Sequence, residues 1–545
     1  MRQVTIHNNF GSPKGASRFP VRVLTLVVLT LTLSISVFGD VKKTRHQAQK
    51  ALRSGDFARA EELYREVLKI DEQDNEARLG LSEALLKQRR LQEAFDSAAR
   101  VVASEPLSPR AHALLGSAML ATGDFRLSIQ EFRTALALDD DNAMAVAGLA
   151  MVDFYENRTL EALNKLRHAI DINPDEPDYV FGLAQAAARS ERFKEAADAY
   201  ERFLVISPRT DRDRRARIRG MIDFLKYLGR QSALYSVSGS DRSVLTFESV
   251  DNRPILKIHI NGSKRTFRFV LDTGSGMSVI SEETARKLGL RPVARGGMAR
   301  AIGGGGRFEI VYGCVDSLEL GDIRIENVPV YIRHFYDAHN PVDGYLGISA
   351  LVRLVTSVDY GSRRMTFARQ RSDTDLSTIV DRPAQNVSAR PGIDVPLRTT
   401  SSGFLSGEVI IEGISKPLNF IIDTGATVTV LSESLAAREE AKNFLQDDRM
   451  RVFGAAGIAE NVQVALLPRI ALGTYSQDRV NAAVLDLDPV NETAGFQQNG
   501  ILGGNFLRYF RVVFDFTRGV VRLEPLETAK PQNDGMPSEA RPGIQ

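Results

Sequence analysis

The chain has 545 residues, 43% of them hydrophobic and 25% charged, which is the composition of an ordinary globular protein. A single hydrophobic core stops growing near about 250–300 residues, so this length predicts several domains. The formal net charge of +2 argues against a nucleic-acid partner, and the single cysteine, Cys314, rules out an intrachain disulfide framework. We expect Cys314 to be a small buried residue without a chemical role.

The first 39 residues have the pattern of an export signal. An apolar run at 23–38 is followed by the small residue Gly39, and four basic residues precede it: Arg2, Lys14, Arg18 and Arg22. The run is long for a secretory signal and short of the ~20 residues of a membrane-spanning helix. A cleaved signal and a retained anchor therefore both fit. Either one exports the protein, as a periplasmic or secreted protein or as one held at the inner membrane by its N-terminus.

Residues 40–230 are rich in Ala, Leu, Glu and Arg at helical spacing and repeat with a period of 34. One position of the repeat holds a small residue five times: Ala60, Ala94, Ser128, Ala162 and Ala196. Four residues later stand Tyr64, Ala98, Phe132, Leu166 and Tyr200. The small residue lets two helices approach, and the later residue fills the space against the next repeat. The segment resembles the tetratricopeptide repeat, with five repeats and a capping helix.

Tetratricopeptide arrays form a groove that binds peptides or partner proteins, so the resemblance implies a protein partner for this region. The repeated residues are core positions and do not identify that partner. We interpret the basic run at 209–217 as a solvated surface of the cap in preference to a binding patch. The polar segment 231–242 is expected to be a linker.

One phrase occurs twice in the second half of the chain. Residues 267–274 read FRFVLDTG and residues 418–425 read LNFIIDTG, each an apolar strand that ends at a carboxylate before a Gly turn. A glycine stands ten residues before each aspartate, at Gly262 and Gly413, as expected for a hairpin of alternating apolar residues. Recurrence with matched surroundings predicts that the two carboxylates meet across a pseudo-twofold axis.

The repeated features define duplicated lobes rich in short strands, at 243–370 and 391–527. A Pro-, Ser- and Asp-containing linker joins them at 371–390, and the polar tail at 528–545 is expected to be disordered. Three further aspartates recur with the lobes, and we expect turn and hairpin roles for them: Asp343, Asp359 and Asp515.

The paired lobes resemble the retropepsin–pepsin group of aspartic peptidases, and most closely the bacterial retropepsin-like lobes. The resemblance implies a multidomain α plus all-β chain of bacterial origin, with an α-solenoid followed by a two-lobed β-barrel pseudo-dimer. It implies catalytic carboxylates at Asp272 and Asp423, supported by Thr273, Gly274 and Ser275 in one lobe and by Thr424, Gly425 and Ala426 in the other. Apolar-Gly segments that pass behind the aspartates would be Leu346-Gly347 and Leu502-Gly503, and mobile flaps fall at Gly303, Gly304, Gly305, Gly454 and Gly457.

The chemistry of such a pair follows from the residue types. Two carboxylates held a few ångströms apart cannot both ionise easily, so they share one proton. The ionised partner takes a proton from water, and the protonated partner donates toward the substrate oxygen. A hydroxyl follows only the first Asp-Thr-Gly, at Ser275, and would favour the charged form of its neighbour. We therefore expect Asp272 to ionise more readily and Asp423 to hold the shared proton more often.

No metal or cofactor is implied, because the seven histidines lack metal-ligand spacing. The sequence predicts an exported aspartic endopeptidase whose helical repeats recruit a substrate or partner protein. A second interpretation keeps both regions but makes the protein a catalytically silent, peptide-binding scaffold or assembly factor. A third pairs the lobes between chains, so that activity depends on dimerisation.

Overall fold

The computed structural model describes residues 41–337, 340–370 and 391–526. The predicted signal, the linker at 371–390 and the predicted tail lie outside these residues. The described residues fall into two compact units that divide after Arg90, and each is described by itself. In the described part of the chain, no helix is both long and apolar enough to cross a membrane.

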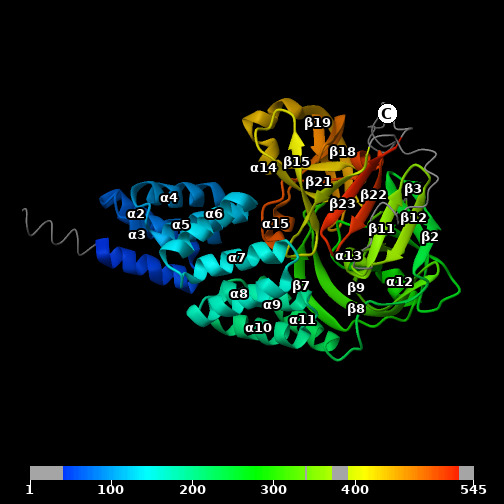
Figure 1. Ribbon diagram of the computed structural model, residues 1–545, viewed down its shortest axis with the longest axis horizontal. Helices are drawn as coiled ribbons and strands as arrows, with labels where there is room; N and C mark the ends of the chain where they lie inside the picture. Colours follow the sequence, from blue (N-terminus) through cyan, green and yellow to red (C-terminus); the bar gives the residue numbers. More distant parts are fainter. Residues whose placement is uncertain (1–40, 338–339, 371–390, 527–545) are drawn as a thin grey trace, which may run out of the picture. The chain divides into compact units, whose positions relative to one another are not determined.

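Pairs of helices joined by short turns make up the repeat region (Figure 1). The first unit contains a helix at 41–54, α2 (Phe57–Ile70) and α3 (Asn75–Lys87). The second unit continues with α4 (Leu91–Ser104), α5 (Pro109–Thr122), α6 (Phe125–Leu138), α7 (Ala143–Tyr155), α8 (Thr159–Ile172), α9 (Pro177–Arg189), α10 (Phe193–Ile206) and α11 (Arg212–Leu228). The predicted helical-repeat fold is confirmed.

The repeated residues form the core of the array, as their spacing predicts. The five small residues at the first repeated position are all 0% exposed. The larger residue one turn later packs on a glycine of the next repeat: a Cβ on Gly148 would lie 2.2 Å from the ring of Phe132, and one on Gly182 would lie 3.1 Å from Leu166. These glycines remove the side chain that would otherwise hold successive repeats apart.

The turn between the two helices of each repeat has a left-handed residue at the same position every 34 residues. These residues are Gly55, Arg89, Gly123, Asn157 and Glu191, and all have positive φ. A side chain makes this conformation unfavourable for arginine and glutamate. Three of the five positions lack glycine, so the local sequence does not account for the left-handed conformation there. At these positions the packing of the repeats imposes it.

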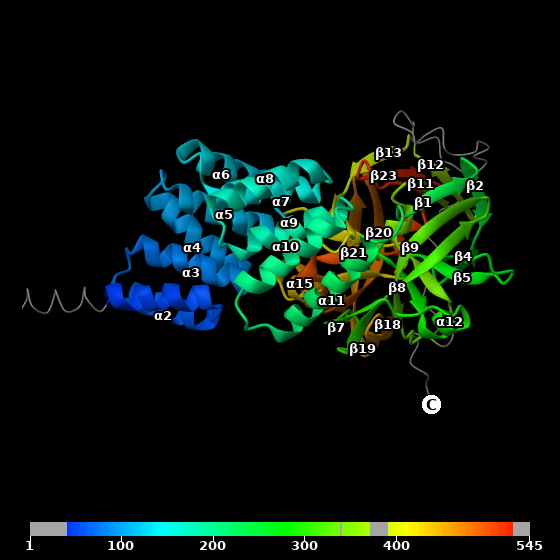
Figure 2. The ribbon, with the colours of Figure 1, turned by 90° about the horizontal axis from the view of Figure 1, so that it is seen from below.

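The lobes follow as two curved, strand-rich bodies (Figures 1 and 2). Lobe 1 contains β1 (Ser236–Gly239), β2 (Arg242–Thr246), β3 (Glu248–Val250), β4 (Arg253–Ile260), β5 (Phe267–Leu271), β6 (Ser278–Ser281), α12 (Glu282–Lys287), β7 (Ala294–Arg300), β8 (Arg307–Leu320), β9 (Ile323–Arg333), β10 (Gly344–Leu346), α13 (Ile348–Leu351), β11 (Leu354–Asp359) and β12 (Arg364–Arg369). Residues expected to be a linker thus contain β1, which pairs with Ile323–Glu326 of β9. A polar composition does not prevent this, because an edge strand is held by main-chain hydrogen bonds.

Lobe 2 repeats the order of the strands that follow its first hairpin and adds two short helices, η1 and α15. It contains β13 (Ile393–Pro396), β14 (Arg398–Thr399), β15 (Leu405–Ile411), β16 (Leu418–Ile422), β17 (Thr429–Ser432), α14 (Glu433–Ala436), the 3₁₀ helix η1 (Glu439–Phe444), β18 (Leu445–Gly454), β19 (Gly457–Leu472), β20 (Tyr475–Leu485), α15 (Asp488–Ala494), β21 (Gly500–Leu502), α16 (Gly504–Leu507), β22 (Phe510–Asp515) and β23 (Val520–Pro525). The matched order confirms the duplicated, two-lobed β-rich fold.

The lobes share a sheet. Each lobe has a large sheet of its own, with nine strands in lobe 1 and eight in lobe 2. A third, six-stranded sheet has the order β13-β23-β22-β11-β12-β2 and takes three strands from each lobe. Its centre is the antiparallel pair β11–β22, in which Ser357 lies opposite Val513. This shared sheet fixes the two lobes of one chain against each other.

Turns of the helical repeats contact the lobes within the second unit. Arg189, at the end of α9, donates from Nη1 to the carbonyl of Thr399 at 3.5 Å. Two residues later, Glu191 forms an ion pair of 3.0 Å with Arg353 of lobe 1. A Cβ on Gly123, in an earlier turn, would lie 2.1 Å from the side chain of Asn419. The inter-helix turns therefore form the edge of the array that contacts the lobes.

Candidate active site

The two repeated aspartates lie directly against each other's turns. Asp272 follows β5 and Asp423 follows β16, the equivalent strand of lobe 2. A Cβ on Gly274 would lie 2.3 Å from Oδ2 of Asp423, and one on Gly425 would lie 2.7 Å from Oδ1 of Asp272. The two carboxyl groups interact directly, and each shifts the pKa of the other. The site is thus assembled within a single chain, and each glycine makes room for the opposite carboxyl group.

A reciprocal set of hydrogen bonds from the two threonines locks the turns together. The Thr273 hydroxyl donates to the carbonyl of Ile422 at 2.8 Å and accepts the Thr424 N–H at 3.0 Å. The Thr424 hydroxyl donates to the carbonyl of Leu271 at 2.7 Å and accepts the Thr273 N–H at 3.2 Å. Both threonines are 0% exposed. Buried main-chain groups of each lobe therefore depend on the other lobe for their hydrogen bonds.

The apolar-Gly segments pass behind the aspartates. β10 runs parallel to β5, with Leu346 beside Leu271, and β21 runs parallel to β16, with Leu502 beside Ile422. The main-chain N–H of each aspartate donates to this segment at 3.0 Å, from Asp272 to Leu346 and from Asp423 to Leu502. Gly347 and Gly503 continue past the turns, where a Cβ on either would lie 2.5 Å from main-chain atoms.

The two carboxyl groups have different surroundings. Asp272 accepts the Ser275 hydroxyl at 2.6 Å and the Gly274 N–H at 3.0 Å, whereas Asp423 accepts the Gly425 N–H at 2.7 Å. Ala426 provides no hydroxyl in the second lobe.

Burial raises the pKa of both carboxyl groups, but to different extents. For Asp423 the negative charge of Asp272 raises the pKa further, well above its usual value. For Asp272 the rise in pKa caused by burial is opposed by the hydrogen bond from Ser275 and by the contact with Asp423. The pKa of Asp272 is therefore raised less than that of Asp423. That Asp272 ionises first and Asp423 holds the shared proton stays a prediction from the sequence.

The Gly-rich stretches lie at the tips of two long hairpins. Flap 1 denotes the β7–β8 hairpin, with its tip at 301–306, and flap 2 denotes the β18–β19 hairpin, with its tip at 454–457. Gly303, Gly304 and Gly305 have φ of 91°, 66° and 62°, a conformation that favours glycine.

The tips of the two flaps touch. The Ala456 N–H donates to the carbonyl of Ile302 at 3.2 Å, and a Cβ on Gly303 would lie 2.6 Å from the Cα of Gly454. Side chains at either glycine would separate the tips.

A cavity of about 880 Å³ lies between flap 1, flap 2 and the body of lobe 2. Its walls include Arg300, Gly303, Gly304, Ile458, Val462, Leu485 and Pro489. Val462 and Leu485 belong to an apolar cluster against which Ala426 packs. The wall of the cavity therefore packs, through this cluster, against the turn that carries Asp423.

The remaining predicted residues take structural positions. Asp343 accepts the Arg268 N–H at 2.9 Å and the Thr284 hydroxyl at 2.8 Å. Asp359 accepts the Ser362 N–H and Asp515 the Arg518 N–H, each at 3.0 Å. The contacts of Asp359 and Asp515 are turn contacts of the expected kind, whereas Asp343 instead connects β5 and α12, which are far from it in the sequence.

Two other predictions concern side chains outside the aspartate pair. Cys314 is half-buried where a buried residue was expected, and burial raises the pKa of its thiol to about 11, so the thiol stays protonated. The basic run at 209–217 is largely exposed, and three of its arginines, with Arg219, line a cavity of about 500 Å³.

Sequence reasoning missed Arg253, at the start of β4. Its positive charge lowers the pKa of Asp272, though less than Ser275, Asp423 or Gly274 do. The side chain is 11% exposed and lies 3.4 Å from the carboxylate of Asp337. Its place directly before the alternating residues of β4 is the only signal in the sequence, and a basic residue there is ordinarily read as the polar end of a strand.

Comparisons with known families agree with both halves of the chain. Residues 256–350 and 407–506 match the family described as aspartyl protease. Residues 51–118 match one tetratricopeptide-repeat family, and residues 94–143 and 147–209 match another. The chain therefore combines tetratricopeptide repeats, a protein-interaction module, with a retropepsin-like aspartyl protease domain.

Solved structures similar to this chain include tetratricopeptide-repeat proteins. TTC0263 of Thermus thermophilus is 19% identical over 34% of this chain and 99% of its own, with a TM-score of 0.30. The pilF protein of Pseudomonas aeruginosa is 14% identical over 36% of this chain and 89% of its own, with a TM-score of 0.27. MamA of Desulfovibrio magneticus RS-1 is 20% identical over 30% and 94%, with a TM-score of 0.23. No curated protein matches the chain.

Proposed function

We propose that this protein is an exported aspartic endopeptidase that hydrolyses peptide bonds with a water activated between Asp272 and Asp423. The observation that supports this best is the apposition of the two carboxyl groups, each against the glycine of the opposite turn. Their unequal pKa values favour a singly protonated pair, which is the form that general acid–base catalysis by two carboxyl groups requires.

In this mechanism the carboxylate of Asp272 removes a proton from the water as the water attacks the carbonyl carbon. Asp423 donates its proton to the carbonyl oxygen, which gives a tetrahedral gem-diol. Asp272 then returns its proton to the amide nitrogen while Asp423 takes one from a gem-diol hydroxyl, so that the C–N bond breaks and the amine and the carboxylic acid are released. An extended peptide lies beneath the two flaps, and the cavity beside flap 1 accepts substrate side chains. Glycines at the flap tips let main-chain groups approach the peptide closely.

The helical repeats recruit a substrate or partner protein, and the N-terminal segment exports the protein. Both points rest on the repeat architecture and on the sequence of the first 39 residues. The alternative is a silent scaffold that binds peptides with the same surfaces. A buried pair of carboxyl groups that share a proton favours the enzyme, because a binding module gains nothing from the cost of burying them.

The decisive experiment measures cleavage of an unfolded protein and a peptide library at roughly pH 4–7, the range in which a carboxyl pair works. We expect the wild type to cleave, pepstatin to inhibit, and Asp272→Asn and Asp423→Asn each to abolish cleavage at every protein concentration. The matched control is Asp478→Asn, which removes an exposed carboxylate paired with Arg469 on lobe 2. Undiminished cleavage by both site variants would show that the protein is no aspartic peptidase.

A further inference from the structure

Helix α11, the last helix of the repeat region, runs along flap 1 of the protease lobe. Figures 1 and 2 show α11 beside β7, with which it is in contact. The helix meets the hairpin through residues 213, 217, 220 and 224, whose spacing places them on one helical face. The contacts differ along the helix, being polar near the tip of the flap and apolar near its base.

In the middle of this contact the two main chains touch. A Cβ on Gly220 would lie 2.2 Å from the carbonyl oxygen of Arg295, and a Cβ on Gly297 would lie 3.1 Å from the Cβ of Ala216. Small residues on both sides are what such an approach requires. Gly297 also has φ of 67°, where the pairing of β7 with β8 is irregular. The glycine pair at 296–297 therefore lets the hairpin follow the helix.

At its base, flap 1 is fixed by an aromatic stack. Phe224 of α11 stacks on Tyr312 of β8, with 4.2 Å between ring centroids and 19° between ring planes. Each residue is 1% exposed. Burial of two large aromatic side chains is strongly stabilising, so this end of the hairpin is firmly held.

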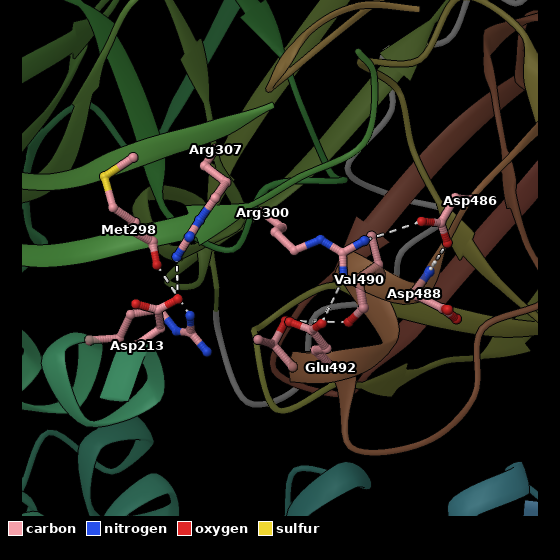
Figure 3. A network of polar contacts seen from close by, with 10 residues as sticks. Asp213, Met298, Arg300, Arg307, Asp486, Asp488, Val490 and Glu492 are labelled. Atoms are coloured by element: carbon pink, nitrogen blue, oxygen red, sulfur yellow. Dashed lines mark hydrogen bonds and ion pairs between the residues drawn. The ribbon is translucent and has the colours of Figure 1, made fainter. Parts of the chain in front are cut away.

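Near its tip, flap 1 is held by exposed polar contacts. Figure 3 shows Arg307 directed to Asp213, with which it forms an ion pair. Arg217 donates to the carbonyl of Met298 at 3.1 Å. The Asp213 and Arg307 side chains are 56% and 49% exposed, so the pair adds little stability and breaks easily. A firm base and a weakly held tip are the arrangement of a hinged hairpin.

The other side of the flap tip is tied to lobe 2. Arg300 lies 3.0 Å from Glu492 of α15 and 3.4 Å from Asp486, which precedes α15 (Figure 3). The chain just after α15 is itself seated on the repeats: the Gln497 N–H donates to the carbonyl of Ala121 at 2.8 Å. The flap tip therefore contacts the helical repeats directly through α11, and indirectly through the segment around α15.

We propose that α11 is a positioning element of the peptidase, and that Asp213 and Arg217 hold the tip of flap 1 in its closed position against flap 2. Since the same helix belongs to the repeat array, the array sets how readily flap 1 opens to admit a peptide. The inference rests on the proposed peptidase function for its effect on catalysis, but the clamp itself is measurable without any catalysis.

The test is a charge exchange across the Asp213–Arg307 pair. Asp213→Arg and Arg307→Asp each replace attraction by repulsion, and the double variant Asp213→Arg/Arg307→Asp restores an ion pair. Amide hydrogen exchange is followed in flap 1 at 298–309 and, as an internal reference, in flap 2 at 450–460. We expect each single variant to raise exchange in flap 1 about three- to tenfold, without a change in flap 2, and the double variant to return it to the wild-type rate.

Lys226→Glu is the matched control, because Lys226 also lies on α11 and the substitution breaks its exposed ion pair with Glu201 of α10. It should leave exchange in flap 1 unchanged. Peptide hydrolysis by the same proteins should show a similar three- to tenfold fall in kcat/KM for the single variants and recovery in the double variant. Unchanged flap 1 exchange in both single variants would overturn the clamp. A clamp seen by exchange in a protein that cleaves nothing would instead overturn the proposed function.

Discussion

The two lobes have the same strands around the same Asp-Thr-Gly turn, but they differ in what surrounds those strands. In lobe 1 a serine hydroxyl contacts the aspartate, and a helix of the repeat region packs along the flap. In lobe 2 an alanine takes the place of the serine, and the first strand of flap 2 contains three consecutive exposed residues at 447–449. The shared backbone brings the carboxyl groups together. The side chains that differ give the two carboxyl groups different hydrogen bonds and give flap 1 a helix to pack against.

The close approach of each turn glycine to the opposite carboxyl group is common to both lobes. Adding one carbon to each glycine tests it. Gly274→Ala and Gly425→Ala each place a Cβ within 2.7 Å of the opposite carboxyl group. Because a displacement of about 1 Å costs about a hundredfold in rate, we expect at least that loss of kcat for both variants. Gly274→Ala should be the worse, since its Cβ would lie 2.3 Å from Asp423. The measurement is kcat with a peptide substrate.

Gly413→Ala is a suitable control for the glycine variants, because it also lies in a turn of lobe 2 and its Cβ would have no neighbour closer than 3.5 Å. Because Gly413 has φ of 94°, the substitution should lower the stability of the protein. It should not disturb the aspartate pair. Near-normal turnover by either site variant would mean that the carboxyl groups do not need this spacing.

The sequence predicted the symmetric features well and the asymmetric contacts poorly. The 34-residue period, the repeated Asp-Thr-Gly and the apolar-Gly segments are local patterns, and each has its expected place in the fold. The contact of Gly220 with Arg295 and Gly296 joins residues about 75 positions apart that have no repeated partner in lobe 2. Nothing local marks such a pair. The same holds for β1, whose polar residues resemble a linker until their partner strand is known.

The threonines provide a second test of symmetry, with a smaller effect. Thr273→Val leaves the Ile422 carbonyl and the Thr424 N–H without their hydrogen bonds, and Thr424→Val does the same in the other direction. An unsatisfied buried group costs about 1–3 kcal/mol and each variant leaves two of them, so each should lower the free energy of unfolding by about 2–6 kcal/mol. Chemical denaturation measures this.

Reciprocity makes the threonine prediction sharper. Because each hydroxyl bonds to the main chain of the other turn, the double variant should lose less than the sum of the single losses. Thr134→Val, which removes an exposed hydroxyl bonded within α6, is the control and should change stability by less than about 0.5 kcal/mol. Strongly unequal losses for the two site variants would contradict a symmetric lock.

The smallest predicted effect concerns the asymmetry of the aspartates. Ser275→Ala removes the hydroxyl that stabilises the charged form of Asp272, so the pKa of Asp272 should rise and the acidic limb of the pH–rate profile should move to higher pH. A hydrogen bond to a charged group is worth about 1.5 kcal/mol or more, which corresponds to a roughly tenfold lower kcat/KM on the acidic side. The rate on the alkaline side should change little.

Ala426→Ser applies the opposite change to the other lobe. A hydroxyl next to Asp423 would favour the charged form of Asp423 and so lower its pKa. Asp423 would then lose the shared proton at lower pH, and the alkaline limb of the pH–rate profile should move to lower pH. The double variant exchanges the two environments and should recover a profile near that of the wild type, with the roles of the aspartates reversed. If Ser275→Ala leaves the acidic limb in place, the hydroxyl does not decide which carboxyl group ionises, and the division of roles must then arise from more distant charges such as Arg253.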